Sequence, residues 1–273
     1  MPNSHITSLH SPHVERVKAL LGSRGKKFRR EGKVFIADGI QSVREALSPK
    51  LERAPQLEEL FLTNSGLAKL VDDCGEPEFA RLTENIEVRL VSDEIMKAMA
   101  DTEAPQGILA LCSYRENTLH RLQQSNPNRL AYFWEMQDPG NSGTVIRTAD
   151  ATGFDAVIFS EKSVDIYSPK TVRATAGSLW HLPAIEDVGL EELMEFAQEN
   201  GFTTIAMAGE SESSFLDLPA SEKVILLFGN EARGLPEITG ADHRVHIPMK
   251  GHAESLNVAI AAAITMFHFG IQQ

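Results

Sequence analysis

The second half of the chain contains five short apolar runs that alternate with longer segments of helical character. The runs are RLAYFWEM, DAVIFS, FTTIAMAG, KVILLFG and HRVHIPM. Runs this short and this uniformly apolar are typical of parallel strands that are buried on both faces. Helices are expected between them at residues 143–152, 169–179, 190–198 and 256–269. Because strands and helices alternate, this part is predicted to be an α/β domain with a mostly parallel sheet.

The first half also alternates strands and helices. A helix is expected at 11–21, with Ser11 as N-cap and Pro12 at its first position, and another at 40–47. Strands are expected in KVFIADG, LEELFLT and GILALCSY, and VRLVSDEIMKAM predicts a strand followed by a helix that Ser92 caps. The polar stretch ENTLHRLQQSNPNR is typical of a linker. We therefore predict a first domain at 1–115, a linker at 116–128 and a second domain at 129–273.

Charge is distributed unevenly along the chain. The net charge of −12 argues against non-specific nucleic-acid binding by the chain as a whole. Residues 1–115 hold 16 Lys and Arg against 17 Asp and Glu, whereas residues 129–273 hold 9 against 20. One basic cluster, opposed only by Glu31, can neutralise several backbone phosphates, although a solvated surface loop is the simpler explanation of this stretch taken alone. The cluster consists of Arg24, Lys26, Lys27, Arg29, Arg30 and Lys33.

Cysteine and histidine usage argues against disulfides and metal sites. Cys74 and Cys112 form no CxxC pair and have no nearby His cluster. His243 and His246 lie three apart in an expected strand, where they would point to opposite faces, so we expect no metal ligands. The first residues lack a signal-peptide pattern, and no apolar run approaches the roughly 20 residues needed to span a bilayer. We therefore expect a soluble, cytoplasmic protein.

Three segments of the second half carry more Gly, Asn and charge than packing requires, and each follows an expected strand, where open α/β sheets bind ligands. In DPGNSGTVIRTADATGFDAV, Asn141 can lead a helix that Gly153 ends. Arg147 lies in an otherwise small and apolar part of that helix. Pairing with Asp150 at i+3 is the structural explanation, but the position of Asn141 and Arg147 beneath a strand end favours a functional one.

The other two segments also carry unexpected polar residues. In LLFGNEARGLP, Gly229 allows a close backbone approach and Glu231 lies in a loop too small to bury an unpaired carboxylate. In IPMKGHAESLNVAIAAAI, Ser255 is a good N-cap, and capping does not require Asn257 as well. A free helix start can hold an anion. The chain lacks GxGxxG, GxxxxGK[ST] and GxSxG, which disfavours a generic nucleotide-binding enzyme or an esterase.

Together, and in this order, the three segments resemble the signature motifs of the SpoU (TrmH-type) family of SPOUT RNA 2′-O-methyltransferases. The matching residues are Asn141, Gly143, Arg147, Gly229, Asn230, Glu231, Gly234, Leu235, Ile247, Pro248, Gly251, Ser255, Leu256, Asn257 and Val258. The segment 168–183 is also similar to the family, through Pro169, Arg173, Ala174 and Gly177. The first domain resembles the family's substrate-binding domain more loosely. Asp38 stands where Glu is more frequent, and Thr175 and Ala259 stand where Ser is common.

The resemblance implies a fold and a cofactor. The second domain is expected to be a SPOUT domain with a C-terminal trefoil knot, and the first a small ribosomal-protein-like α/β domain. A homodimer through the C-terminal domain is implied, with each active site near the subunit interface. S-adenosyl-L-methionine (SAM) is expected to lie bent in the knot. Its expected contacts are Ala208, Gly209, Leu227, Phe228, Gly229, Ile247, Met249, Ser255, Leu256 and Asn257.

The implied reaction is methyl transfer to a ribose 2′-OH of structured RNA, with ribosomal RNA favoured over transfer RNA and no DNA or membrane partner. Arg147 is expected either to accept the hydroxyl proton or to orient the hydroxyl and a phosphate. Asn141, Glu231, Ser255 and Asn257 complete the expected catalytic set. The basic cluster and Arg173 are expected to bind RNA. Two alternatives are a non-catalytic RNA-binding protein on the same fold and a base-directed SPOUT methyltransferase.

Overall fold

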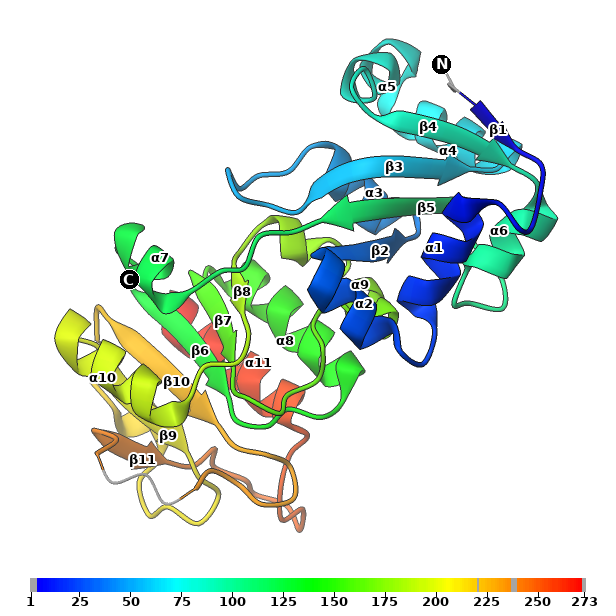
Figure 1. The fold of residues 1–273 in the computed structure, drawn as a ribbon. Coiled ribbons are helices and arrows are strands. Elements are labelled where there is room, and N and C mark those ends of the chain that lie inside the picture. Colours follow the sequence, from blue (N-terminus) through cyan, green and yellow to red (C-terminus); the bar gives the residue numbers. More distant parts are fainter. Residues whose placement is uncertain (1–3, 220, 237–239, 272–273) are drawn as a thin grey trace. The chain divides into compact units, whose positions relative to one another are not determined.

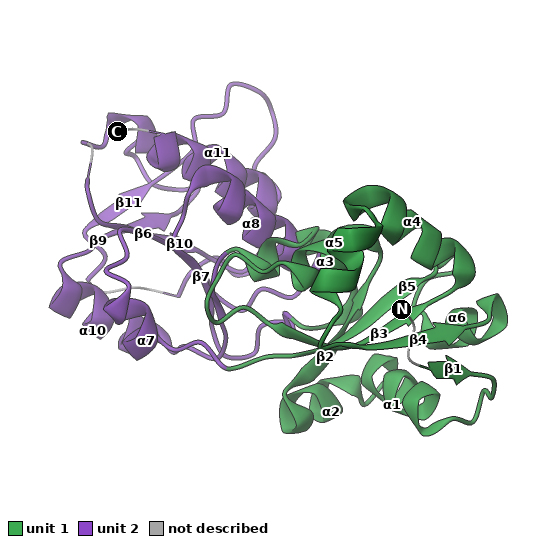
Figure 2. Cartoon of the chain, turned by 90° about the horizontal axis from the view of Figure 1, so that it is seen from above, with its two compact units in different colours: residues 1–115, 167–181 green, residues 116–166, 182–273 purple. Residues whose placement is uncertain are grey.

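The computed structural model describes residues 4–219, 221–236 and 240–271 of the chain (Figure 1). These residues form two compact units, shown in green and purple in Figure 2. The first unit comprises residues 1–115 and 167–181, and the second comprises residues 116–166 and 182–273. No helix among the described residues is long and apolar enough to cross a membrane.

The first unit is built on a mixed five-stranded sheet with the order β1-β4-β3-β5-β2. β1, β4 and β3 are parallel neighbours, while β5 runs antiparallel to both β3 and β2. Its strands are β1 (Ser4–Ile6), β2 (Val34–Asp38), β3 (Gln56–Leu62), β4 (Glu87–Val91) and β5 (Ile108–Ser113). Its helices are α1 (Pro12–Leu21), α2 (Gly25–Gly32), α3 (Ile40–Leu47), α4 (Asn64–Cys74), α5 (Glu76–Leu82), α6 (Asp93–Met99), α9 (Pro169–Thr175) and the 3-10 turn η1 (Ser178–Trp180).

Most elements predicted for this unit are confirmed, and four elements were not predicted. The Ser92 hydroxyl caps α6 by accepting a hydrogen bond from the Ile95 amide at 3.2 Å, as expected. The sequence did not predict β1, α4 or α5. The basic stretch forms the helix α2, which packs against α1 and β2, rather than a surface loop.

Residues 167–181, which the predicted boundaries assigned to the second domain, pack with the first unit. Contacts among four aromatic rings explain this. The Tyr167 ring stacks on Tyr114 with 3.8 Å between centroids, and Phe35 lies 4.9 Å from Tyr167 and 5.9 Å from Trp180. Trp180 is fully buried, so this segment contributes large apolar area to the core of the first unit.

The second unit is built on a six-stranded sheet with the order β11-β9-β10-β6-β7-β8, in which every neighbouring pair is parallel. The prediction of an α/β domain with a parallel sheet is therefore confirmed. The strands are β6 (Arg129–Phe133), β7 (Ala156–Phe159), β8 (Ala184–Ile185), β9 (Thr203–Met207), β10 (Val224–Phe228) and β11 (His243–Val245). The helices are α7 (Leu119–Gln124), α8 (Pro139–Thr152), α10 (Leu190–Asn200), α11 (Val258–Ile271) and the 3-10 turn η2 (Phe215–Asp217).

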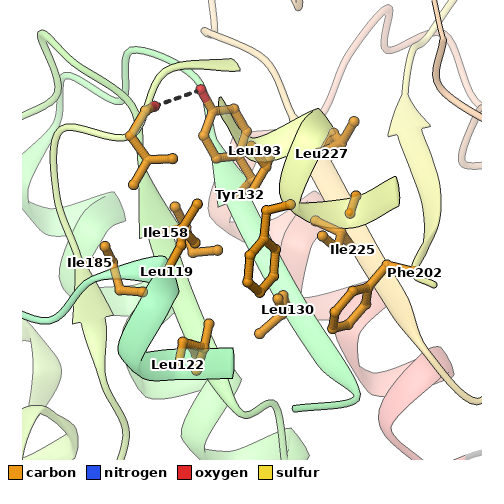
Figure 3. Packing of buried hydrophobic residues seen from close by; sticks show 14 of the residues in the cluster. Leu119, Leu122, Leu130, Tyr132, Ile158, Ile185, Leu193, Phe202, Ile225 and Leu227 are labelled. Atoms are coloured by element: carbon orange, nitrogen blue, oxygen red, sulfur yellow. Dashed lines mark hydrogen bonds between the residues drawn. The ribbon is translucent and has the colours of Figure 1, made fainter. Parts of the chain in front are cut away.

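Helices cover both faces of this sheet, which is why its strands are apolar on both sides (Figure 2). α8 and α11 pack together on one face. α7 and α10 cover the other, where Leu119, Leu193 and Ile225 share one core (Figure 3). Within it the Tyr132 hydroxyl donates a hydrogen bond to the Val188 carbonyl at 3.2 Å.

The stretch predicted to be a linker contains α7. Leu119 and Leu122 of α7 are buried in the core of the second unit. The linker assignment rested on the polar residues around this helix, but two leucines at i and i+3 are enough to anchor one apolar face of a short helix. Residues 116–128 are therefore attached to the second unit rather than extended between two domains.

Candidate active site

A pocket opens at the carboxyl ends of β11, β9 and β10, three neighbouring strands of the parallel sheet. About 750 Å³ of it is free of protein atoms, part of it open to solvent. Open α/β sheets bind ligands at this edge because the loops that follow parallel strands converge there. The pocket is lined by Met207, Ala208, Gly209, Phe228, Gly229, Asn230, Glu231, Gly234, Val245, His246, Ile247, Met249, Glu254, Ser255, Leu256, Val258 and Ala261.

The loop after β10 is closed by its own backbone. The Asn230 amide donates to the Gly234 carbonyl at 3.0 Å, and the Gly234 amide donates back to Asn230 at 2.8 Å. A Cβ added to Gly229 would lie 2.2 Å from the Gly234 carbonyl carbon, so only glycine fits at this position. Gly234 itself has φ +67. This tight loop carries Glu231 at the pocket wall.

Three side chains from the three predicted motifs form one hydrogen-bonded chain. The Asn141 amide nitrogen donates to the Glu231 carboxylate at 3.1 Å, and the Asn257 amide nitrogen donates to the Asn141 side-chain oxygen at 3.2 Å. Each carboxamide has an NH2 group that donates and an oxygen that accepts, so these hydrogen bonds fix which end of each amide faces its partner. The structure therefore brings together residues that lie 90 and 116 positions apart in sequence.

Two helix starts differ from the sequence prediction. Asp138, rather than Asn141, caps α8, because its carboxylate accepts the Asn141 amide at 2.7 Å and α8 begins at Pro139. Asn257, rather than Ser255, caps α11, because its side-chain oxygen accepts the Ala259 amide at 2.9 Å. Asn257 therefore has two roles: one end of its amide caps the helix and the other contacts Asn141.

Arg147 is exposed on α8 and does not line the pocket. Within the described part of the chain, its guanidinium has no hydrogen-bond or ion-pair partner, and the ion pair with Asp150 that offered a structural explanation does not form. Two predicted cofactor contacts also lie outside the lining. Leu227 is fully buried in the core on the face of the sheet that α7 and α10 cover. The Asn257 side chain donates a hydrogen bond to Asn141 instead.

Two predicted RNA contacts are engaged inside the first unit. Arg29 is buried, and its guanidinium donates to the Leu20 carbonyl. Arg173 donates to Asp101 at 2.9 Å and lies 3.8 Å from the Asp38 carboxylate. Burial raises the pKa of the Asp38 carboxyl, and the nearby Arg173 charge opposes that rise.

An ion pair beneath the loop after β10 was missed by the sequence interpretation. Glu135 follows β6, is buried, and has φ 46. Its carboxylate pairs with Arg233, and Lys162 lies 3.8 Å away. Its carbonyl accepts the Asn230 side-chain amide at 2.9 Å. The one available signal was an acidic residue at the end of a fully apolar run.

The family of the chain follows from comparison with known proteins. The model of the SpoU rRNA Methylase family matches residues 129–267, and that of the MRM3-like substrate binding domain matches residues 14–110. The chain belongs to the SpoU rRNA methylase family.

Individual relatives span nearly the whole chain. The 23S rRNA (guanosine(2553)-2′-O)-methyltransferase RlmP of Bacillus subtilis is 30% identical over 96% of this chain and 99% of its own length. The 23S rRNA (uridine(2479)-2′-O)-methyltransferase of Streptomyces viridochromogenes is 30% identical over 96% of this chain and 90% of its own.

Solved structures of methyltransferases are also similar to this chain along nearly its whole length. The AdoMet-bound rRNA methyltransferase of Sinorhizobium meliloti superposes with a TM-score of 0.80 at 28% identity, covering 97% of this chain and 96% of that one. The methyltransferase AviRb of S. viridochromogenes, in complex with AdoMet, superposes with a TM-score of 0.81 at 26% identity, covering 96% and 98% of the two chains. AdoMet is SAM, so both are cofactor complexes of proteins with this fold.

Proposed function

We propose that this protein transfers a methyl group from SAM to a ribose 2′-OH of structured RNA, with ribosomal RNA favoured over transfer RNA. The observation that carries the proposal is the hydrogen-bonded chain of Glu231, Asn141 and Asn257 beside a pocket at the strand ends. It unites the three family motifs in one place. Two relatives similar along their whole length are named as 23S rRNA 2′-O-methyltransferases, which supports ribosomal RNA.

The pocket suits SAM chemically. Backbone groups at Gly209 and Gly229 offer hydrogen bonds to a flat base edge, and Met249 and Leu256 offer apolar cover. Glu231 and Glu254 supply negative charge at the wall, which favours a cationic ligand. When bound, SAM supplies an activated methyl carbon on a positively charged sulfonium. Ser255 lines the pocket on the loop before α11, where its hydroxyl can contact the ligand.

The protein's contribution to the reaction is alignment and proton handling. A ribose hydroxyl is a poor nucleophile at neutral pH, so positioning and deprotonation during attack both accelerate transfer. Arg147 is exposed, and its guanidinium is available to a phosphate and the hydroxyl. A free arginine is too basic to accept a proton readily, which favours the orienting role of Arg147 over the proton-accepting one.

The first unit provides the RNA-binding surface in this proposal. The basic residues of α2 and its ends contact backbone phosphates, with Arg29 holding the helix in place rather than reaching the RNA. Arg173 contributes only where the RNA displaces its acidic partners. The domain limits 1–115 and 129–273 are proposed as the limits of RNA binding and methyl transfer.

We also propose a homodimer through the second unit. α11 exposes a stripe of large apolar side chains at helical spacing, with exposures of 52% for Ile260, 39% for Ile264, 61% for Phe267 and 58% for Ile271. Monomeric proteins rarely expose such a stripe. Arg147 lies on α8, which packs beside α11, so a second copy seated on this stripe would bring an arginine toward the other copy's pocket.

Two further proposals rest on family membership. The chain after the edge strand β11 returns to α11, which packs against α8, and we propose that this return closes a trefoil knot. An experimental chain trace without a crossing there would contradict it. We further propose that the protein acts in the cytoplasm, on the RNA of assembling ribosomes.

The test is transfer of radiolabelled methyl groups from SAM to unmodified total RNA by the wild type and by Arg147→Ala. We expect one labelled ribosomal RNA with the wild type and a loss of label with the variant. SAM binding by the wild type without transfer to any RNA would favour the non-catalytic alternative. Absence of SAM binding would contradict the proposed function itself.

A further inference from the structure

The basic helix α2 carries an exposed aromatic side chain. Phe28 is 43% exposed, and it is the one exposed large apolar side chain among the described residues of the first unit. A single exposed apolar residue needs no explanation by itself. The position of Phe28 is informative because RGKKFRREGK surrounds it with six basic residues and one acidic residue.

The buried face of α2 is fixed, so Phe28 is held outward. Arg29 is buried at 6% exposure and donates to the Leu20 carbonyl. The Tyr114 hydroxyl donates to the Arg29 carbonyl at 3.4 Å. A Cβ on Gly25 would lie 2.3 Å from the Leu20 carbonyl oxygen, which shows how closely α2 approaches α1. The ring of Phe28 is therefore presented by an anchored helix and not by a frayed end.

Cationic groups beside Phe28 are available to a ligand. Arg24 is the N-cap residue of α2, four positions before Phe28, and its guanidinium has no ion-pair or hydrogen-bond partner in the part of the chain that the structure describes. Lys27 pairs with Glu31 at 3.7 Å, but both side chains are well exposed, at 70% and 62%. Exposed pairs of this kind contribute little, so a phosphate can replace Glu31.

We propose that α2 binds a single-stranded segment of RNA, with Phe28 stacking on an unpaired base and Arg24 and Lys27 contacting the flanking phosphates. This inference rests on the proposed function for the presence of an RNA substrate. Stacking on an aromatic face combined with backbone phosphate contacts is how proteins bind unpaired nucleotides. A protein partner fits less well, because the core of a protein interface is depleted in charge, whereas Phe28 is ringed by it.

The experiment measures the affinity of the full-length protein for two fluorescent RNAs, a 20-nucleotide single strand of mixed sequence and the duplex of the same sequence. We expect Phe28→Ala to weaken single-strand binding about tenfold and duplex binding less than about twofold, since stacking requires an unpaired base. Phe28→Tyr retains a stacking face and should bind as the wild type does.

Three results would overturn the inference: equal single-strand affinity of Phe28→Ala and wild type, an equal loss for both probes, or no single-strand binding by the wild type. Thermal unfolding and SAM binding serve as folding controls, because Phe28 is exposed and does not line the pocket. Methyl transfer to total RNA separates this inference from the proposed function. If the wild type transfers methyl groups and Phe28→Ala binds RNA normally, the function stands and this inference fails.

Discussion

The two units assemble their candidate functional residues in opposite ways. In the second unit, a wholly parallel sheet gathers loops from distant parts of the chain, and Asn141, Glu231 and Asn257 meet at its edge. In the first unit, all the candidates except Arg173 are neighbours in sequence, on α2 and at its two ends. A site built from distant loops depends on the whole sheet, whereas a surface on one helix depends on that helix and its anchor.

The two units also differ in their net charge. The first unit holds 18 basic and 17 acidic side chains, and the second holds 8 and 21. An acidic unit suits a cationic cofactor and repels phosphates, while a neutral unit with a basic helix suits RNA. Cofactor chemistry and RNA affinity should therefore respond to different substitutions.

The largest effect is expected from Asn257→Ala. The variant loses the hydrogen bond to Asn141 and the cap of α11, so methyl transfer should fall about 100-fold, because small misplacements in an aligned site are costly. Initial rates of transfer check this. Asn257→Asp keeps a capping oxygen and loses the donor to Asn141, so it should retain stability and still lose activity. Normal activity of Asn257→Asp would contradict the proposed role of the hydrogen bonds that join Asn257, Asn141 and Glu231.

The second-largest effect is expected from a substitution that disrupts the proposed homodimer. Phe267→Glu places a charge in the middle of the apolar α11 stripe and should convert the protein to a monomer of 30.0 kDa, with loss of transfer. Light scattering coupled to gel filtration measures the mass. Leu216→Glu is the matched control, since Leu216 is 56% exposed outside α11 and should leave the mass unchanged. A monomeric wild type would refute the proposed dimer.

A smaller effect is expected from the ion pair below the loop after β10. Arg233→Ala leaves the buried Glu135 carboxylate with Lys162, at 3.8 Å, as its cationic partner among the described residues, and we expect a loss of about 1–2 kcal/mol in unfolding free energy. Arg233 is largely exposed, which keeps the loss at this level. Urea unfolding measures it. Arg233→Lys should recover most of the stability, and an unchanged midpoint for Arg233→Ala would show that the pair is not needed.

A change confined to the first unit should leave the cofactor site intact. The double variant Arg24→Ala, Lys27→Ala should bind RNA several-fold more weakly and lower the slope of log affinity against log salt by about 2. Its affinity for SAM should equal that of the wild type. Titrations at several salt concentrations and calorimetry with SAM check the two parts. A parallel loss of SAM affinity would break the separation between the units.

The smallest effect is a pH dependence of stability that arises at the β11 edge of the second unit's sheet. Asp242 accepts the Thr204 amide and hydroxyl, both at 2.8 Å, and these hydrogen bonds hold the pKa of its carboxyl below the ordinary value. A lowered folded-state pKa stabilises the protein above the unfolded value of about 3.9, and this contribution is lost as pH falls through the folded-state pKa. Asp242→Asn should therefore differ from the wild type in urea midpoint at pH 7, with the difference shrinking toward pH 3. A difference that grew on acidification would contradict this sign.

The sequence predicted the strands because apolar runs are a local signal, and it predicted the meeting of the motifs because each motif follows a parallel strand. Apolar runs define buried strands, and loops after parallel strands converge at one edge, so Asn141 and Glu231 were expected together. It did not predict which core holds Tyr167 and Trp180. The large aromatic side chains of these two residues predict that they are buried. They do not indicate whether they pack in the core of the first unit or of the second.

Two other features escaped prediction for equally physical reasons. α2 lacks an apolar stripe, since its buried face is formed by Gly25 and an arginine, so hydrophobic periodicity gave no signal. The Glu135–Arg233 pair joins residues 98 positions apart, and no local pattern identifies such partners. The choice of Asn257 over Ser255 as helix cap differs by two residues, within the usual uncertainty of a helix end.

The central claim is that the methyl group is placed on a ribose hydroxyl. The most direct measurement digests ribosomal RNA labelled by the wild-type protein to nucleosides and identifies the labelled nucleoside by mass spectrometry. We expect a single 2′-O-methylnucleoside that is absent when the protein carries Asn257→Asp. Label recovered on a base would contradict the ribose assignment and favour a base-directed methyltransferase built on the same fold.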